Sequence, residues 1–154
     1  MPDDYDFGNA SNYSFVNQIT CKNDETRKMY ILAYGHMLNY NHEEAIACFQ
    51  KCTELDPDCA MAWWGIAYCL SSNYNWTPGL GSGYDPIQQA ISLKNTCSEL
   101  EQDLINALAK RHSEEARDGA DPSVLNMGNS LELNIAFADA MAPLYEKYEG
   151  NLDV

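Results

Sequence analysis

Apolar side chains recur at intervals of three and four residues over most of the chain, which is the spacing of one face of an α-helix. This pattern predicts a helix from Asp24 to Asn39, with Asp24 as its N-cap. It predicts a second helix from His42 to Leu55, which Asp56 and Pro57 end. The turn between them is so short that the two helices must pack antiparallel.

The same pattern predicts four further helices and no strand, so the fold class is all-α with about six helices. Their expected ranges are 59–70, 85–94, 98–111 and 130–148. Asp85 is the expected N-cap of the helix at 85–94, because Pro86 follows it at the first helical position. The segments 71–84 and 112–126 contain Gly and Pro and are expected to be loops.

The chain divides into an arm and one domain. Residues 1–22 are rich in Asp, Asn, Ser and Tyr and show no helical period, which predicts an extended N-terminal arm. Residues 23–154 are then a single helical domain, since a chain of 154 residues fits one compact unit.

A repeat of about 34 residues is visible in the helical part. Four positions of the first helix are matched by four positions of the third at the same internal spacing. The pairs are Met29 with Trp63, Leu32 with Ile66, Ala33 with Ala67, and His36 with Leu70. Two copies of one half-repeat are therefore present.

Together with Ala45, Phe49, Cys52 and Pro57, this run resembles the tetratricopeptide repeat. The segments 41–46, 56–68 and 73–75 also look like a family of longer, largely uncharacterised tetratricopeptide-repeat proteins. The resemblance implies antiparallel helical hairpins stacked as a short right-handed solenoid. It also implies that further repeats complete such an array.

In a tetratricopeptide array the first helices of successive pairs line a concave face. The resemblance places a Tyr-, Trp-, Met- and Arg-rich set there, and these residue types are common in binding hot spots. The expected partner-binding residues, including two from the aromatic loop, are Arg27, Tyr30, Tyr34, Met37, Trp64, Tyr68, Tyr74 and Trp76. The competing interpretation is that these side chains pack against the protein's own chain.

The six cysteines favour reduced, buried thiols over a disulfide framework, because three of them lie inside amphipathic helical patterns. Cys48 and Cys52 share one helical face, and with His42 and Cys59 they would suit a soft metal such as copper or zinc. The favoured interpretation is that these thiols fill the core, because the chain has no CxxC pair and no HExxH motif. No cofactor is therefore predicted.

The charge balance restricts the partners. Asp and Glu number 23 against 9 Lys and Arg, and the formal charge of -14 repels nucleic acids and anionic membranes. No apolar run approaches the ~20 residues of a membrane span, and residues 1–6 do not resemble a signal peptide, so a cytoplasmic location is expected. An acidic cluster is expected to be a solvated face; it comprises Glu99, Glu101, Asp103, Glu114, Glu115, Asp118 and Asp121.

The leading hypothesis is a protein- or peptide-binding interaction module, acting either alone or as one part of a larger assembly. A second chain that completes the repeat array is a further expected partner, because residues 151–154 end without a polar capping helix. The alternative is a subunit or N-terminal fragment of an enzyme, metal-dependent or not, whose remaining repeats lie on another chain. The three histidines are too scattered to indicate a catalytic triad, so enzyme activity is left open.

Overall fold

The computed structural model describes residues 18–71, 83–114 and 127–149, and side chains from 131 onward in the last range. Within these ranges all regular structure is helical, which confirms the predicted all-α class. The elements are α1 (Asp24–Leu38), α2 (His42–Leu55), α3 (Ala60–Cys69), α4 (Tyr84–Leu93), the 3₁₀-helix η3 (Lys94–Thr96), α5 (Glu99–Ala109) and α7 (Met127–Lys147).

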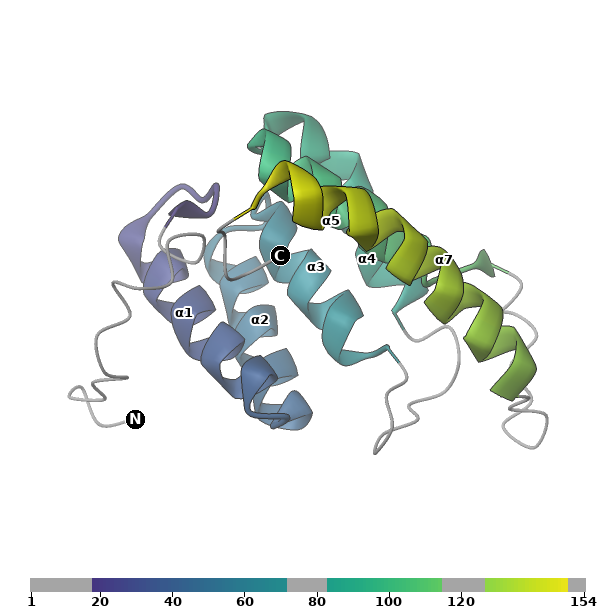
Figure 1. The fold of residues 1–154 in the computed structure, drawn as a ribbon. Helices are drawn as coiled ribbons and strands as arrows, with labels where there is room; N and C mark the ends of the chain where they lie inside the picture. The colour runs from purple at the N-terminus through teal and green to yellow at the C-terminus, as the bar shows by residue number, and fades with distance from the viewer. Residues whose placement is uncertain (1–17, 72–82, 115–126, 150–154) are drawn as a thin grey trace.

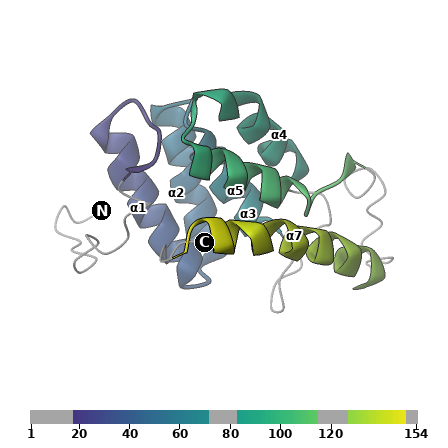
Figure 2. The ribbon, with the colours of Figure 1, turned by 45° about the horizontal axis from the view of Figure 1, so that its top comes forward.

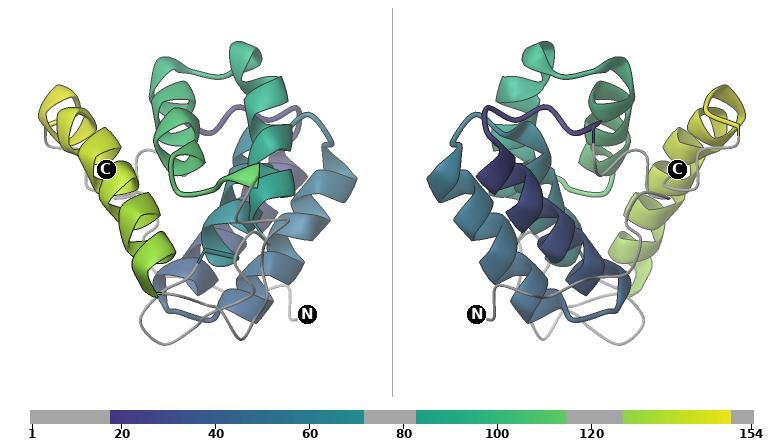
Figure 3. Two further views of the ribbon diagram at one scale, coloured as in Figure 1. Left: turned by 90° about the vertical axis from the view of Figure 1, so that its right-hand side faces the viewer. Right: turned by 90° about the vertical axis from the view of Figure 1, so that its left-hand side faces the viewer.

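Each described helix packs on the next one along the chain, from α1 to α5 and then α7 (Figure 1). In addition α3 contacts both α1 and α5, so α3 lies between these two helices in the stack. The main core lies among α1 to α5, and α7 is the outermost helix, with all the others to one side of it (Figures 2 and 3). One long face of α7 is therefore left uncovered by the other helices.

The start of α1 differs by one residue from the prediction. Asn23 is the N-cap, with extended backbone, and its Oδ1 accepts a hydrogen bond of 2.8 Å from the Thr26 amide. Asp24 is instead the first helical residue, where its negative charge interacts favourably with the positive end of the helix dipole. Asn and Asp are about equally good caps, so the sequence did not distinguish the two positions.

The start of α4 also differs from the prediction, because Tyr84 already belongs to the helix and Gly83 precedes it as N-cap. A Cβ atom on Gly83 would lie 2.8 Å from the Ala67 carbonyl oxygen and 2.3 Å from the His112 ring. Only glycine fits this close approach to the end of α3. The predicted N-cap, Asp85, lies in the first turn of α4 instead.

The helices α2 and α3 approach closely because their contact uses one small residue. A Cβ atom on Gly65 would lie 2.4 Å from the fully buried ring of Phe49. The matched repeat positions Ala33 and Ala67 are both fully buried as well. Small side chains at these positions let neighbouring helix backbones pack against each other.

The segment before α1 is attached to the helices by two buried carboxylates. The Thr20 amide donates a hydrogen bond of 2.7 Å to Glu101 Oε1, and the Lys22 amide donates one of 2.7 Å to Asp56 Oδ2. Ile19 is buried beside them. The last residues of the predicted arm therefore belong to the packed domain, and residues 1–17 lie outside the described residues.

Candidate interaction surface

The predicted binding residues of α1 lie in the core. Tyr30, Tyr34 and Met37 expose 0%, 6% and 5% of their surface. The Tyr30 ring packs edge-on against Phe49, with centroids 5.3 Å apart, and stacks on Tyr34 at 6.1 Å. The fourth residue, Arg27, donates a hydrogen bond of 3.0 Å from Nη1 to the Ile19 carbonyl oxygen. These side chains connect α1 to other parts of the same chain.

The predicted binding residues of α3 are likewise used within the fold. Trp64 is buried, and its Nε1 donates a hydrogen bond of 3.2 Å to the Leu104 carbonyl oxygen of α5. Tyr68 is partly buried and stacks on Trp64 at 5.3 Å. Tyr74 and Trp76 lie outside the described residues. The sequence left two interpretations open, a partner-binding surface and packing within the chain. The side chains of Tyr30, Tyr34, Met37 and Trp64 are buried within the chain itself.

The candidate metal ligands are not gathered into a site. In the described ranges no group of three or more His, Cys, Asp or Glu side chains is placed to hold a metal ion, and this includes His42, Cys48, Cys52 and Cys59. All six cysteines are free, as the sequence predicts. Burial raises the pKa of Cys52 and of Cys59 to about 12, so both thiols stay protonated at neutral pH.

Ser71 and His112 form the one described Ser–His hydrogen bond, with 3.1 Å between Ser71 Oγ and His112 Nε2. Ser71 is buried, and its hydroxyl also donates to the Ala67 carbonyl oxygen at 2.9 Å. Burial, and then the neighbouring Arg111 charge, lower the pKa of His112 to about 4, so the ring is neutral at pH 7. The pair therefore connects the segments that follow α3 and α5.

The prediction that the acidic cluster is a solvated face is wrong for Glu101, which is fully buried. Its carboxylate accepts hydrogen bonds from the Thr20 amide, the Thr20 hydroxyl and the Ser98 amide at 2.7, 2.6 and 2.8 Å. With Ser98 it forms a capping box at the start of α5. The motif Ser98–Glu101 was the sequence signal for this role. Glu115, Asp118 and Asp121 lie outside the described residues.

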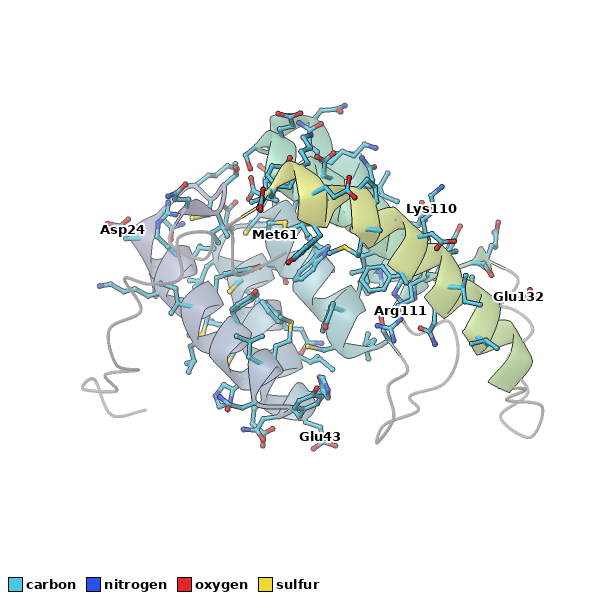
Figure 4. The ribbon with its side chains drawn as sticks, viewed as in Figure 1. Asp24, Glu43, Met61, Lys110, Arg111 and Glu132 are labelled. Atoms are coloured by element: carbon cyan, nitrogen blue, oxygen red, sulfur yellow. The ribbon has the colours of Figure 1, made fainter. Side chains whose placement is uncertain are left out.

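The inner face of α7 packs on α5. Arg111, which lies beside α7 in Figure 4, donates a hydrogen bond of 2.8 Å to Asn134 Oδ1. Its guanidinium group lies over the Phe137 ring, 5.5 Å from the ring centroid. Near the other end of α7, Lys147 donates to Glu99 and Asp103 of α5 at 2.6 and 2.7 Å. Polar contacts at both ends therefore fix which face of α7 points outward.

The outer face of α7 carries a stripe of exposed apolar side chains at intervals of four and three residues. Its members, here called the α7 stripe, are Leu131, Ile135, Ala138, Ala142 and Tyr145. Leu131, Ile135 and Tyr145 expose 58%, 51% and 68% of their surface, and they are three of the five large exposed hydrophobics in the described ranges. A contiguous exposed stripe of this kind is typical of a surface that binds another molecule.

Sequence reasoning predicted the helix but did not single out the α7 stripe. The signal was present, because α7 carries two apolar rows, the stripe and the inner row that includes Phe137, Met141 and Leu144. A helix that packs on one neighbour needs only one such row. The second row was therefore the indication of a further contact.

Comparison with protein-family models, with curated proteins and with solved structures finds no match to this chain. None of the described helices combines the length and the apolar character that crossing a membrane requires.

Proposed function

We propose that this chain is a tetratricopeptide-like interaction module, which binds a protein or peptide partner as one part of a larger assembly. The 34-residue period supports the repeat class, because its matched small residues Ala33 and Ala67 are both fully buried. The packing of each helix on its successor, with α3 in contact with both α1 and α5, agrees with a stack of helical hairpins.

The α7 stripe is the observation that carries the proposed binding function. The aromatic residues that the repeat pattern assigns to a concave face are largely occupied by the chain's own helices, so they offer little surface to a partner. The α7 stripe is exposed along about four helical turns and ends in Tyr145, an aromatic residue of the type that dominates binding energy. We place the partner there.

The charge and the thiols support the expected setting. A formal charge of -14 disfavours nucleic acid and anionic membrane as partners. Six free cysteines, four of them buried, agree with a reducing compartment such as the cytoplasm. A protein or peptide is therefore the partner class that we propose.

The test is selection from a displayed peptide library on the purified chain, followed by calorimetry on the enriched peptides. We expect peptides that bind with one-to-one stoichiometry and that lose affinity when Ile135 is changed to Ser. Because Ile135 is half-exposed, the substitution should leave the free energy of unfolding within about 0.5 kcal/mol of wild type. Leu38→Ser is the matched control, since Leu38 is 49% exposed on α1.

Enrichment no greater than on an unrelated acidic helical protein would contradict the interaction module. Enriched peptides that bind Leu38→Ser weakly and Ile135→Ser normally would keep the module but move its surface away from α7. Unfolding curves of both variants show whether each of them is folded in these measurements.

A further inference from the structure

A row of acidic residues runs along one edge of the α7 stripe. Glu132, Asp139 and Glu146 follow one another at intervals of seven residues and are all exposed. Seven residues are nearly two helical turns, so the three carboxylates lie on the same side of the helix. Each of them directly follows a stripe residue in the sequence: Leu131, Ala138 and Tyr145, respectively. The acidic row therefore lies parallel to the apolar stripe.

The opposite edge of the stripe has a different character. That edge turns toward α5 through Asn134, Met141 and Tyr148. The one basic residue of α7, Lys147, directly follows Glu146, lies beyond the acidic row on the side away from the stripe, and is held by Glu99 and Asp103. Its charge is already balanced by two carboxylates of the same molecule. A partner on the α7 stripe therefore meets a negative potential along the acidic row.

A second copy of the chain fits this surface poorly. If two α7 helices packed antiparallel through their stripes, as in a closed two-fold dimer, the acidic row of one copy would face the acidic row of the other. The two chains would also each bring a formal charge of -14 to the contact. Like charges placed opposite each other suppress such pairing.

The centre of the stripe is small while its ends are large. Ala138 and Ala142 lie between Ile135 and Tyr145. A bulky apolar side chain of a partner can lie over the two alanines and contact Ile135 and Tyr145 on either side. A helix with large apolar residues at intervals of three and four presents such side chains along its length.

From the apolar stripe and its acidic edge, we infer that the partner of α7 is a basic amphipathic helix of another protein. This inference rests on the proposed function, of which it specifies the partner. The apolar face of that helix packs on the α7 stripe, and Lys or Arg residues along its edge face Glu132, Asp139 and Glu146. The docked length is about four turns, which is the length of the stripe.

The test uses two stapled helical peptides with N-acetyl and C-amide ends. Both carry Leu at intervals of three and four, and they differ only in having Lys or Glu along the flanks. Fluorescence anisotropy with the full chain should show about tenfold tighter binding of the Lys peptide at low salt, with the difference shrinking at high salt. Ile135→Ser should weaken the Lys peptide about tenfold, while Leu38→Ser should not.

Charge reversal is the decisive variant. The triple variant Glu132→Lys, Asp139→Lys and Glu146→Lys should reverse the preference, so that the Glu peptide binds more tightly. Glu43→Lys is the matched control, because Glu43 is exposed on α2 and lies far from Glu132 (Figure 4). It should leave the preference for the Lys peptide unchanged.

Five outcomes would overturn the inference. Equal binding of both peptides, or a preference that charge reversal leaves intact, would mean that the acidic row does not select the partner. A dimer in sedimentation equilibrium that Ile135→Ser dissociates would make a second copy the occupant. Strong hydrogen-exchange protection of the α7 stripe in an isolated monomer that binds neither peptide would mean that another part of the chain covers it. If the peptide library yields stripe-independent ligands, the interaction module stands and this inference alone fails.

Discussion

Tyr40 follows Asn39, the C-cap of α1, and has a positive φ of 61°. Its amide donates to the Met37 carbonyl oxygen at 3.1 Å, and the next amide, of Asn41, donates to the His36 carbonyl oxygen at 3.0 Å. This pair of hydrogen bonds forms a Schellman-type helix ending, in which the left-handed position is normally glycine. A bulky side chain is strained there.

Tyr40→Gly should therefore stabilise the protein by about 0.5–1 kcal/mol in urea unfolding. The gain is limited by the lost edge contact with the His42 ring, whose centroid lies 5.9 Å from that of Tyr40, and by the greater freedom of glycine in the unfolded chain. Tyr40→Ala removes the same ring but keeps a Cβ atom in the strained position. Equal stability of the Gly and Ala variants would show that the strain relieved at this position is no larger than the entropic cost of glycine.

His112 should make the stability depend on pH. Burial, reinforced by the Arg111 charge, holds its pKa at about 4, against an ordinary value of 6.5. Between these values the unfolded chain binds a proton that the folded chain does not, so stability falls as pH falls from about 6.5 to about 4. The full loss should be roughly 3 kcal/mol, and the loss should not grow further below pH 4.

Urea unfolding at pH 7.5 and 4.5 measures this term as the difference between wild type and His112→Gln. The variant is expected to be less stable at pH 7.5, because the hydrogen bond to Ser71 is altered, but to lose less stability on acidification. His36→Gln is the matched control, because His36 is a partly buried histidine of α1. An identical pH dependence in wild type and His112→Gln would remove His112 as the cause.

Single residues also show how far the sequence could be interpreted. The helical spacing and the repeat pattern assign Tyr34 and Trp64 to a binding face, but spacing cannot say what covers these side chains, and both are buried. The buried state of Trp64 depends on the Leu104 carbonyl, 40 positions away in the chain. Glu101 looks like its solvated acidic neighbours by composition, and only its distance of three residues from Ser98 indicates a cap.

At the scale of the elements, the contact between α2 and α3 depends on Gly65. Alanine is the better helix former by about 1 kcal/mol, so Gly65→Ala would stabilise an exposed helix. Here the added Cβ would lie 2.4 Å from the ring of Phe49, which is fully buried and has little room to move. We expect a net destabilisation of about 1–3 kcal/mol, measured by thermal or urea unfolding.

A double-mutant cycle with Phe49→Leu separates the two effects. The smaller side chain should leave room for the methyl group, so Gly65→Ala should cost less in the Phe49→Leu background. If its cost is the same in both backgrounds, the ring of Phe49 is not what excludes a larger residue at position 65.

The existence and order of the elements could be predicted because each helix has its own apolar period and end signals. Their ends were less predictable where two residues compete for one role, as Asn23 and Asp24 do for the cap of α1. The start of α4 was misplaced because Gly83 is required by the neighbouring Ala67 carbonyl and His112 ring, which are distant in the sequence. The outward face of α7 was not identified, since its two apolar rows alone do not reveal which one packs on α5.

At the scale of the whole molecule, the segment before α1 is joined to elements far along the chain. Glu101 accepts hydrogen bonds from Thr20, 81 positions away, and Asp56 accepts one from Lys22, 34 positions away. Both carboxylates are almost completely buried. A buried carboxylate is tolerated when hydrogen-bond donors surround it, and in Glu101 the donors come from two distant parts of the chain.

Glu101→Gln should therefore destabilise the whole domain by about 1.5–3 kcal/mol, because the amide keeps the shape but places an NH₂ group against donors. Glu99→Gln is the matched control on the same helix end, since Glu99 is exposed and its solvent-screened ion pair with Lys147 should contribute little to stability. Hydrogen exchange distinguishes a global role from a local one. If Glu101 holds the N-terminal segment, the Thr20 amide should lose protection in Glu101→Gln beyond the global loss, whereas the Lys22 amide, held by Asp56, should lose less. Equal loss at both amides would mean that residues 19–22 open as one unit and that neither carboxylate holds its own partner independently.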